Sequence, residues 1–69
     1  MTLADKTVDE VLSRAPIDGS RTAYLQEQSQ FFARMSSDYV SLGNTERADV
    51  SAEVSARLAA ELRRDGGKR

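Results

Sequence analysis

The sequence predicts an all-α protein, in which a short N-terminal helix precedes a long antiparallel helical hairpin. Two observations carry this expectation. Apolar residues recur at three- and four-residue intervals along most of the chain, which is the spacing of one helix face. Pro16 and Gly43 interrupt that spacing and divide the chain into three segments. The 69 residues suffice for one small helical domain, spanning residues 1–69.

The first helix is expected over residues 4–15, and the proline that follows should end it, because proline disfavours the helical conformation of the residue before it. Two capping boxes fit its start. We favour the box that pairs Thr7 with Glu10, and an earlier box would pair Thr2 with Asp5. One apolar face is expected on this helix: Val8, Val11, Leu12 and Ala15.

The second helix is expected over residues 20–42. Asp18 or Ser20 should cap its start, and Gly43 should end it as a C′ residue, because glycine is free to adopt the left-handed conformation. If Gln28 fills one gap, the large apolar residues form a seam with alternating spacing of three and four. This seam should face the third helix: Leu25, Phe32, Met35, Tyr39 and Leu42.

The third helix is expected over residues 48–64, with its start at either Thr45 or Ser51, and residues 65–69 should form a tail. The short break before it makes the second and third helices antiparallel neighbours. Its larger apolar row is Val54, Leu58 and Leu62. A second row consists mostly of small residues, which allow two helix backbones to approach closely: Ala48, Ala52, Ser55, Ala59 and Leu62.

The second helix also supplies the candidate binding surface. Tyr24 and Phe31 lie on one side of the seam, and small residues lie on the other: Ser29, Ala33, Ser36 and Val40. Phe31 and Phe32 point about 100° apart on a helix, so one neighbouring helix does not easily cover both. We expect Phe31 and Tyr24 to face outward and to contact the first helix or another chain. The predicted partner-binding residues are Tyr24, Gln28, Phe31, Phe32, Met35 and Tyr39.

Gln28 has two interpretations at its seam position. It is either exposed at the edge of the seam or a buried polar residue that sets register or oligomeric state, as polar residues do in coiled coils.

The composition weighs against catalysis. The chain has no His and no Cys, so it lacks the commonest general base, a thiolate nucleophile and every Cys/His metal site. We expect no catalytic, cofactor-binding or metal-binding residues. One charged row recurs every fourth residue: Asp49, Glu53, Arg57, Glu61 and Asp65. A metal at Asp49 and Glu53 is one interpretation, but we favour a solvated face with Glu53–Arg57 and Arg57–Glu61 ion pairs.

The net charge of −1 weighs against a general nucleic-acid or membrane binder. Basic residues gather only at the C-terminal end, as candidate phosphate contacts: Arg63, Arg64, Lys68 and Arg69. We favour a simpler interpretation, in which arginines complement the helix dipole and the tail is solvated. No apolar run reaches the length of a signal peptide or a membrane span.

These observations together predict a non-catalytic protein–protein interaction module, such as a small accessory subunit, an assembly chaperone or an inhibitor. Its partner would be another protein chain, in a hetero- or homo-oligomer, because short chains without disulfides often gain burial by assembly. The alternative is a small nucleic-acid-associated or antitoxin-like regulator that uses the basic C-terminus. No cofactor, small-molecule substrate or membrane is expected. We expect a cytoplasmic location, and the excess of Arg over Lys suggests a bacterial source.

Overall fold

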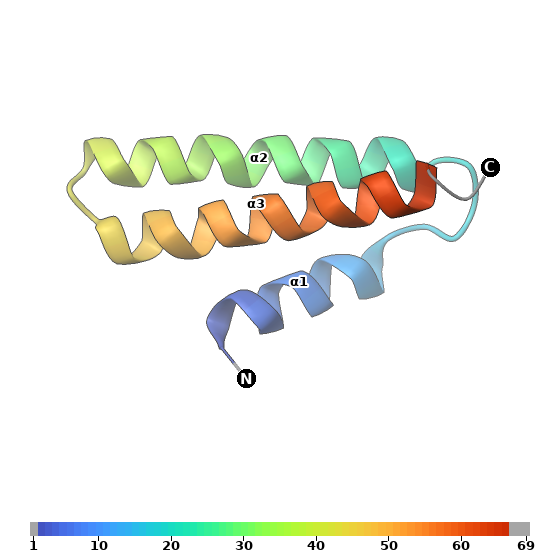
Figure 1. Ribbon diagram of the computed structural model, residues 1–69, viewed down its shortest axis with the longest axis horizontal. Coiled ribbons are helices and arrows are strands. Elements are labelled where there is room, and N and C mark those ends of the chain that lie inside the picture. The colour runs from blue at the N-terminus through green and yellow to red at the C-terminus, as the bar shows by residue number, and fades with distance from the viewer. Residues whose placement is uncertain (1, 67–69) are drawn as a thin grey trace.

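The computed structural model describes residues 2–66, with side chains described for residues 2–64. It contains three helices, α1 (Leu3–Arg14), α2 (Arg21–Ser41) and α3 (Thr45–Gly66), as Figure 1 shows. No strand occurs among the described residues. The all-α class and the three helices predicted from the sequence are therefore confirmed. Within this part of the chain, no helix combines the length and the apolar character that crossing a membrane requires.

The capping box of α1 is the earlier of the two alternatives. The Asp5 amide donates to the Thr2 hydroxyl at 3.1 Å, and the Thr2 amide donates to the Asp5 carboxylate at 3.0 Å. The favoured pairing of Thr7 with Glu10 is wrong, because Thr7 lies inside α1 and its hydroxyl donates to the carbonyl four residues earlier. Ala15 ends the helix in an extended conformation, with φ −66° and ψ 138°, as expected before proline.

The entry to α2 is arranged differently from the expected cap. Ser20 occupies the N-cap position, but its side chain makes no capping hydrogen bond to α2. Instead, the Asp18 carboxylate accepts hydrogen bonds from the Ser20 hydroxyl at 2.6 Å and from the Ser20 amide at 2.9 Å. These two bonds, that of the hydroxyl first, lower the pKa of Asp18. Neither residue therefore caps α2 through its side chain.

The turn between α2 and α3 has the geometry of a Schellman motif. Gly43 adopts a positive φ of 78°, as predicted for the C′ residue. Its amide donates to the Val40 carbonyl at 3.0 Å, and the Asn44 amide donates to the Tyr39 carbonyl at 2.8 Å. The Asn44 side chain then caps α3, because its Oδ1 accepts from the Arg47 amide at 3.2 Å.

This turn decides between the two expected starts of α3. The helix begins at Thr45, not at Ser51, and continues to Gly66. Its end lies two residues beyond the expected end at residue 64, and residues 67–69 of the expected tail lie outside the described residues.

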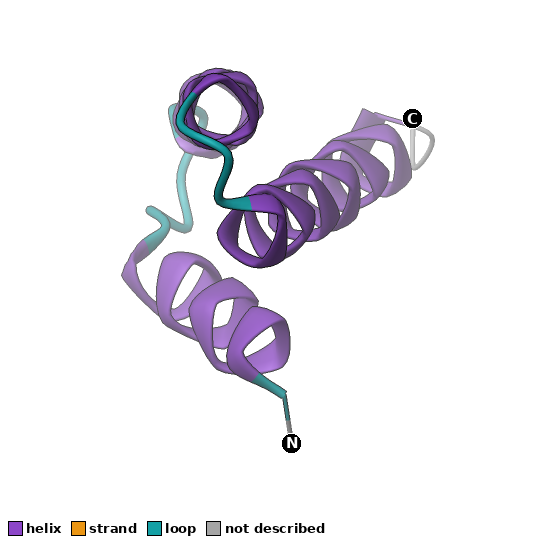
Figure 2. Cartoon of the chain, turned by 90° about the vertical axis from the view of Figure 1, so that its left-hand side faces the viewer, coloured by secondary structure: helices purple, strands orange, loops and turns teal. Residues whose placement is uncertain are grey.

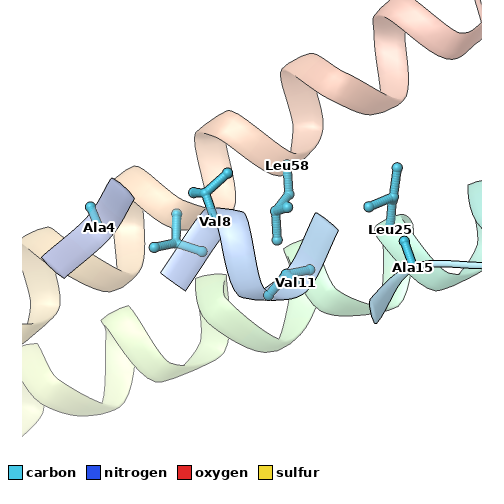
Figure 3. Packing of buried hydrophobic residues seen from close by; sticks show 7 residues of the cluster. Ala4, Val8, Val11, Ala15, Leu25 and Leu58 are labelled. Atoms are coloured by element: carbon cyan, nitrogen blue, oxygen red, sulfur yellow. The ribbon is translucent and has the colours of Figure 1, made fainter. Parts of the chain in front are cut away.

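The core is small, and its residues come from all three helices (Figure 3). Leu25 of α2 and Val54 and Leu58 of α3 are fully buried. The whole cluster comprises Ala4, Val8, Val11, Ala15, Leu25, Val54 and Leu58. The larger apolar row predicted for α3 is confirmed, because Leu62 also packs against this cluster.

The central helix of the three is α3. The main contacts between helices join α3 to α2 and α3 to α1. Figure 1 shows α2 and α3 side by side along their length, and Figure 2 shows α1 set apart from α2. This arrangement leaves one side of α2 without a neighbouring helix.

Candidate functional site

Small side chains form part of the contact between α2 and α3. Ser29 and Ser55 donate to each other's backbone carbonyls, at 3.2 Å and 2.8 Å. One end of the same contact is held by Ser36, whose hydroxyl donates to the Ala48 carbonyl at 2.9 Å. A serine hydroxyl reaches the main chain of a neighbouring helix only when the two backbones are close. The large apolar side chains of α2 differ in burial beside these serines: Leu25 is fully buried, Phe32 packs against the core, and Phe31 is exposed.

An ion pair holds one edge of α1 against α3. The Arg57 guanidinium of α3 binds the Asp5 carboxylate and also pairs with Glu53 at 2.7 Å. The hydrogen bond from Arg57 is the main cause that lowers the pKa of Asp5 from 3.8 to about 2, and the Thr2 backbone and hydroxyl add to it. The same contact raises the pKa of Arg57. Asp5 thus both caps α1 and joins it to α3.

The opposite edge of α1 borders a groove of about 240 Å³. All three helices contribute to it, and its lining is mostly apolar. Phe32, Met35 and Tyr39 of α2 line it and are half-buried, whereas Leu3 of α1 is 64% exposed. The complete lining is Leu3, Thr7, Phe32, Met35, Tyr39, Arg47, Val50, Ser51 and Val54.

A strip of large side chains runs along α2 beside this groove. We call it the α2 strip, and its residues share one helix face by their spacing: Tyr24, Gln28, Phe31, Met35 and Leu42. Phe31 is 54% exposed and Leu42 is 78% exposed. The Phe31 ring meets the Phe32 ring edge to face, with centroids 5.4 Å apart and an interplanar angle of 79°. Phe32 reaches the groove, so the aromatic surface continues from the groove to the strip.

The predicted seam is only partly correct. Leu25 is fully buried, but Leu42 is mostly exposed, so its predicted contact with α3 is wrong. Phe31 faces outward as expected, whereas Tyr24 packs against the core cluster and is half-buried. Gln28 is half-buried at the edge of α2.

The candidate phosphate contacts do not form one site among the described residues. Arg63 and Arg64 are exposed in the last turn of α3, and Arg64 pairs with Glu61 at 3.0 Å. The other two candidates, Lys68 and Arg69, lie outside the described residues.

The charged row of α3 holds one of its two predicted ion pairs. Arg57 pairs with Glu53 as expected, but its second partner is Asp5 of α1, and Glu61 pairs with Arg64. In residues 2–64, no group of three or more acidic side chains is placed to hold a metal ion.

The sequence does not predict the groove, although three of its residues, Phe32, Met35 and Tyr39, are among the candidates. Leu3 lies outside the helix expected over residues 4–15, and Thr7 is the expected cap. Ser51 is a buried polar residue, whereas the sequence indicates it only as a possible helix start. One pattern in the sequence indicates this face of α3, because its residues have a spacing of three and four: Ala48, Ser51, Ser55, Leu58 and Leu62.

The fold and the site define a small three-helix protein with an aromatic surface that its own helices leave partly uncovered. In comparisons with known proteins, no family model, no curated protein and no solved structure matches this chain.

Proposed function

We propose that this chain is a non-catalytic protein–protein interaction module, which binds another protein chain, or itself, through the aromatic side of α2. The observation that carries the proposal is the exposed Phe31 ring beside the groove. Burying one Phe side chain contributes about 1.5–3 kcal/mol, so a ring that is 54% exposed leaves much of that free energy for binding. Aromatic residues and Met are also enriched at protein interfaces.

The geometry of the groove fits a helix as the bound element. Helices that dock in grooves place apolar residues at intervals of three and four against apolar linings.

We take α2, the turn and α3 as the long antiparallel hairpin expected from the sequence. Two contacts support the antiparallel orientation. Ser29 pairs with Ser55, whereas Ser36, which comes later in α2, pairs with Ala48, which comes earlier in α3.

A role without catalysis is supported by composition and by the lining of the groove. The chain contains no His and no Cys, and the groove offers one arginine, two hydroxyl-bearing residues of the Ser/Thr type and one Tyr among apolar side chains. The alternative to an interaction module is a regulator that binds nucleic acid. The two proposals differ in salt dependence, because binding to phosphates weakens steeply with salt and binding through an apolar surface does not.

The test compares two glutamate substitutions on α2 in the source cell. Phe31→Glu places a charge on the proposed surface, and Val40→Glu makes the matched change at a residue that is 61% exposed but lies outside the groove lining and the α2 strip. A tagged chain should run in an assembly heavier than its own 7.6 kDa, and Phe31→Glu, but not Val40→Glu, should abolish that assembly. A chain that runs alone, or equal loss with both variants, would contradict the proposal.

A further inference from the structure

We propose that the occupant of the groove and the α2 strip is a second copy of this chain, so that the protein works as a two-fold symmetric dimer built on α2. This inference rests on the proposed function and names the partner of the same surface.

The surface is self-complementary, which is the requirement of a two-fold interface. Phe31 projects from α2, and the groove lies next to it, since the adjacent ring, Phe32, is part of the groove lining. A cavity of about 150 Å³ accommodates a benzene ring, so a groove of about 240 Å³ has room for one phenyl group. A two-fold axis beside α2 places the Phe31 ring of each copy at the groove of the other copy.

The chemistry of the surface matches the centre of an interface between identical chains. Between Tyr24 and Met35 the α2 strip carries no charged residue, and the exposed Asp38, which falls on the same face by its spacing, lies toward one end, between Met35 and Leu42. Charge depletion with aromatic and Met enrichment characterises buried interface centres, so the centre of the interface is placed at Phe31. The one amide of the strip, Gln28, is half-buried and carries both a donor and an acceptor. The net charge of −1 means that two copies repel each other only weakly.

The exposed area is sufficient for a dimer. With about 200 Å² for a fully exposed large apolar side chain, Leu3, Phe31 and Leu42 together expose about 400 Å². From these three residues alone, two copies would bury about 800 Å², and the half-buried residues of the strip and the groove add to this area. The interface then falls in the range of weak, transient interfaces, which bury less than about 1,200 Å². We therefore expect a dimer that dissociates on dilution.

The first experiment measures the mass of the purified chain by sedimentation from about 1 µM to about 1 mM. The expected result is a shift from 7.6 kDa to twice that mass as concentration rises. Phe31→Glu should stay monomeric over the range, Val40→Glu should behave as the unchanged chain, and circular dichroism should show both to be helical. An unchanged chain that stays monomeric at every concentration would overturn the proposal, whatever the variants do.

The second experiment locates the contact without removing an aromatic ring. The photoreactive residue p-benzoylphenylalanine at position 31 should give a covalent dimer on illumination, with the link mapping to groove residues such as Met35. The same residue at position 40 is the control and should give none. Equal yields from both positions would overturn the placement on the α2 strip.

The two proposals fail separately. A purified chain that is monomeric, but joins a different protein in cells through Phe31, overturns the dimer and leaves the interaction function intact. A bound amphiphile that co-purifies with the monomer and depends on Phe31 overturns both. A chain that is monomeric alone and in cells also overturns both.

Discussion

Ser29 of α2 and Ser55 of α3 form a reciprocal pair, in which the hydroxyl of each donates to the backbone carbonyl of the other. The two hydroxyl oxygens lie 3.4 Å apart, so the pair occupies very little space between the helices. This contact holds α2 and α3 close together at the two serine positions.

A larger side chain at Ser55 should force the helices apart. Ser55→Ala should lower the free energy of unfolding by about 1 kcal/mol, because it removes one hydrogen bond between helices. Ser55→Leu should lower it by about 1–3 kcal/mol, because the added volume has no space. Ala56→Leu, on the exposed neighbour, is the control and should change stability by less than about 0.5 kcal/mol. Urea denaturation measures all three, and equal effects of Leu at both positions would contradict a tight contact.

The turn glycine should resist substitution for a reason of backbone conformation alone. A Cβ at Gly43 would meet no atom within 4 Å, but the positive φ of 78° disfavours any side chain. We expect Gly43→Ala to cost about 1–2 kcal/mol. Gly19→Ala is the matched control, because a Cβ there also meets nothing within 4 Å. Thermal unfolding followed by circular dichroism should separate the two variants; similar midpoints would argue against the left-handed cap.

The core depends strongly on Leu58. This side chain has no exposed surface, and Leu58→Ala should lower the free energy of unfolding by about 2–5 kcal/mol. Ile17→Ala removes a side chain that is 98% exposed and should have almost no effect. Chemical denaturation of both variants gives the comparison. A small loss at Leu58 would mean that the three helices do not share one core.

Acid should weaken the attachment of α1. The pKa of Asp5 is lowered from 3.8 to about 2, so between these pH values the folded chain binds fewer protons at Asp5 than the unfolded chain does. Its stabilising contribution is present above pH about 4 and is lost as the pH falls through about 2. The difference in stability between the unchanged chain and Asp5→Asn should therefore become smaller as the pH falls from about 4 to about 2. Asp49→Asn on the exposed face of α3 is the control, and a constant difference for Asp5→Asn would contradict the Arg57 contact.

The sequence was sufficient for the helices and the Gly43 cap, because local spacing and backbone preference determine them. It did not reveal which face of α2 meets α3. Two rows share the residues Leu25, Phe32 and Tyr39: one row adds Gln28 and Met35, and the other adds Ser29 and Ser36. Hydrophobicity favours the first row, whereas the serines of the second row make the hydrogen bonds to α3. Which row meets α3 depends on the distance between the two helices, and the sequence of either helix alone does not determine that distance.

The groove and the capping box of α1 likewise depend on contacts between residues that are far apart in the sequence. Thr2 and Thr7 both precede an acidic residue by three positions, so local chemistry allows either box. Arg57 decides between them from 52 residues away, because it binds the carboxylate of the Thr2 box. The groove lining likewise combines all three helices, and its shape depends on the position of α1.

Asn44 joins the end of one helix to the beginning of the next. Its amide closes the last turn of α2 on Tyr39, and its side chain closes the first turn of α3 on Arg47. Starting a helix is the slow, unfavourable step of its formation, and here one residue assists that step for two helices. The chain should therefore begin to fold at this turn and extend outward through contacts between residues that are near in sequence. Such a route predicts folding in microseconds to milliseconds, with α1 added last.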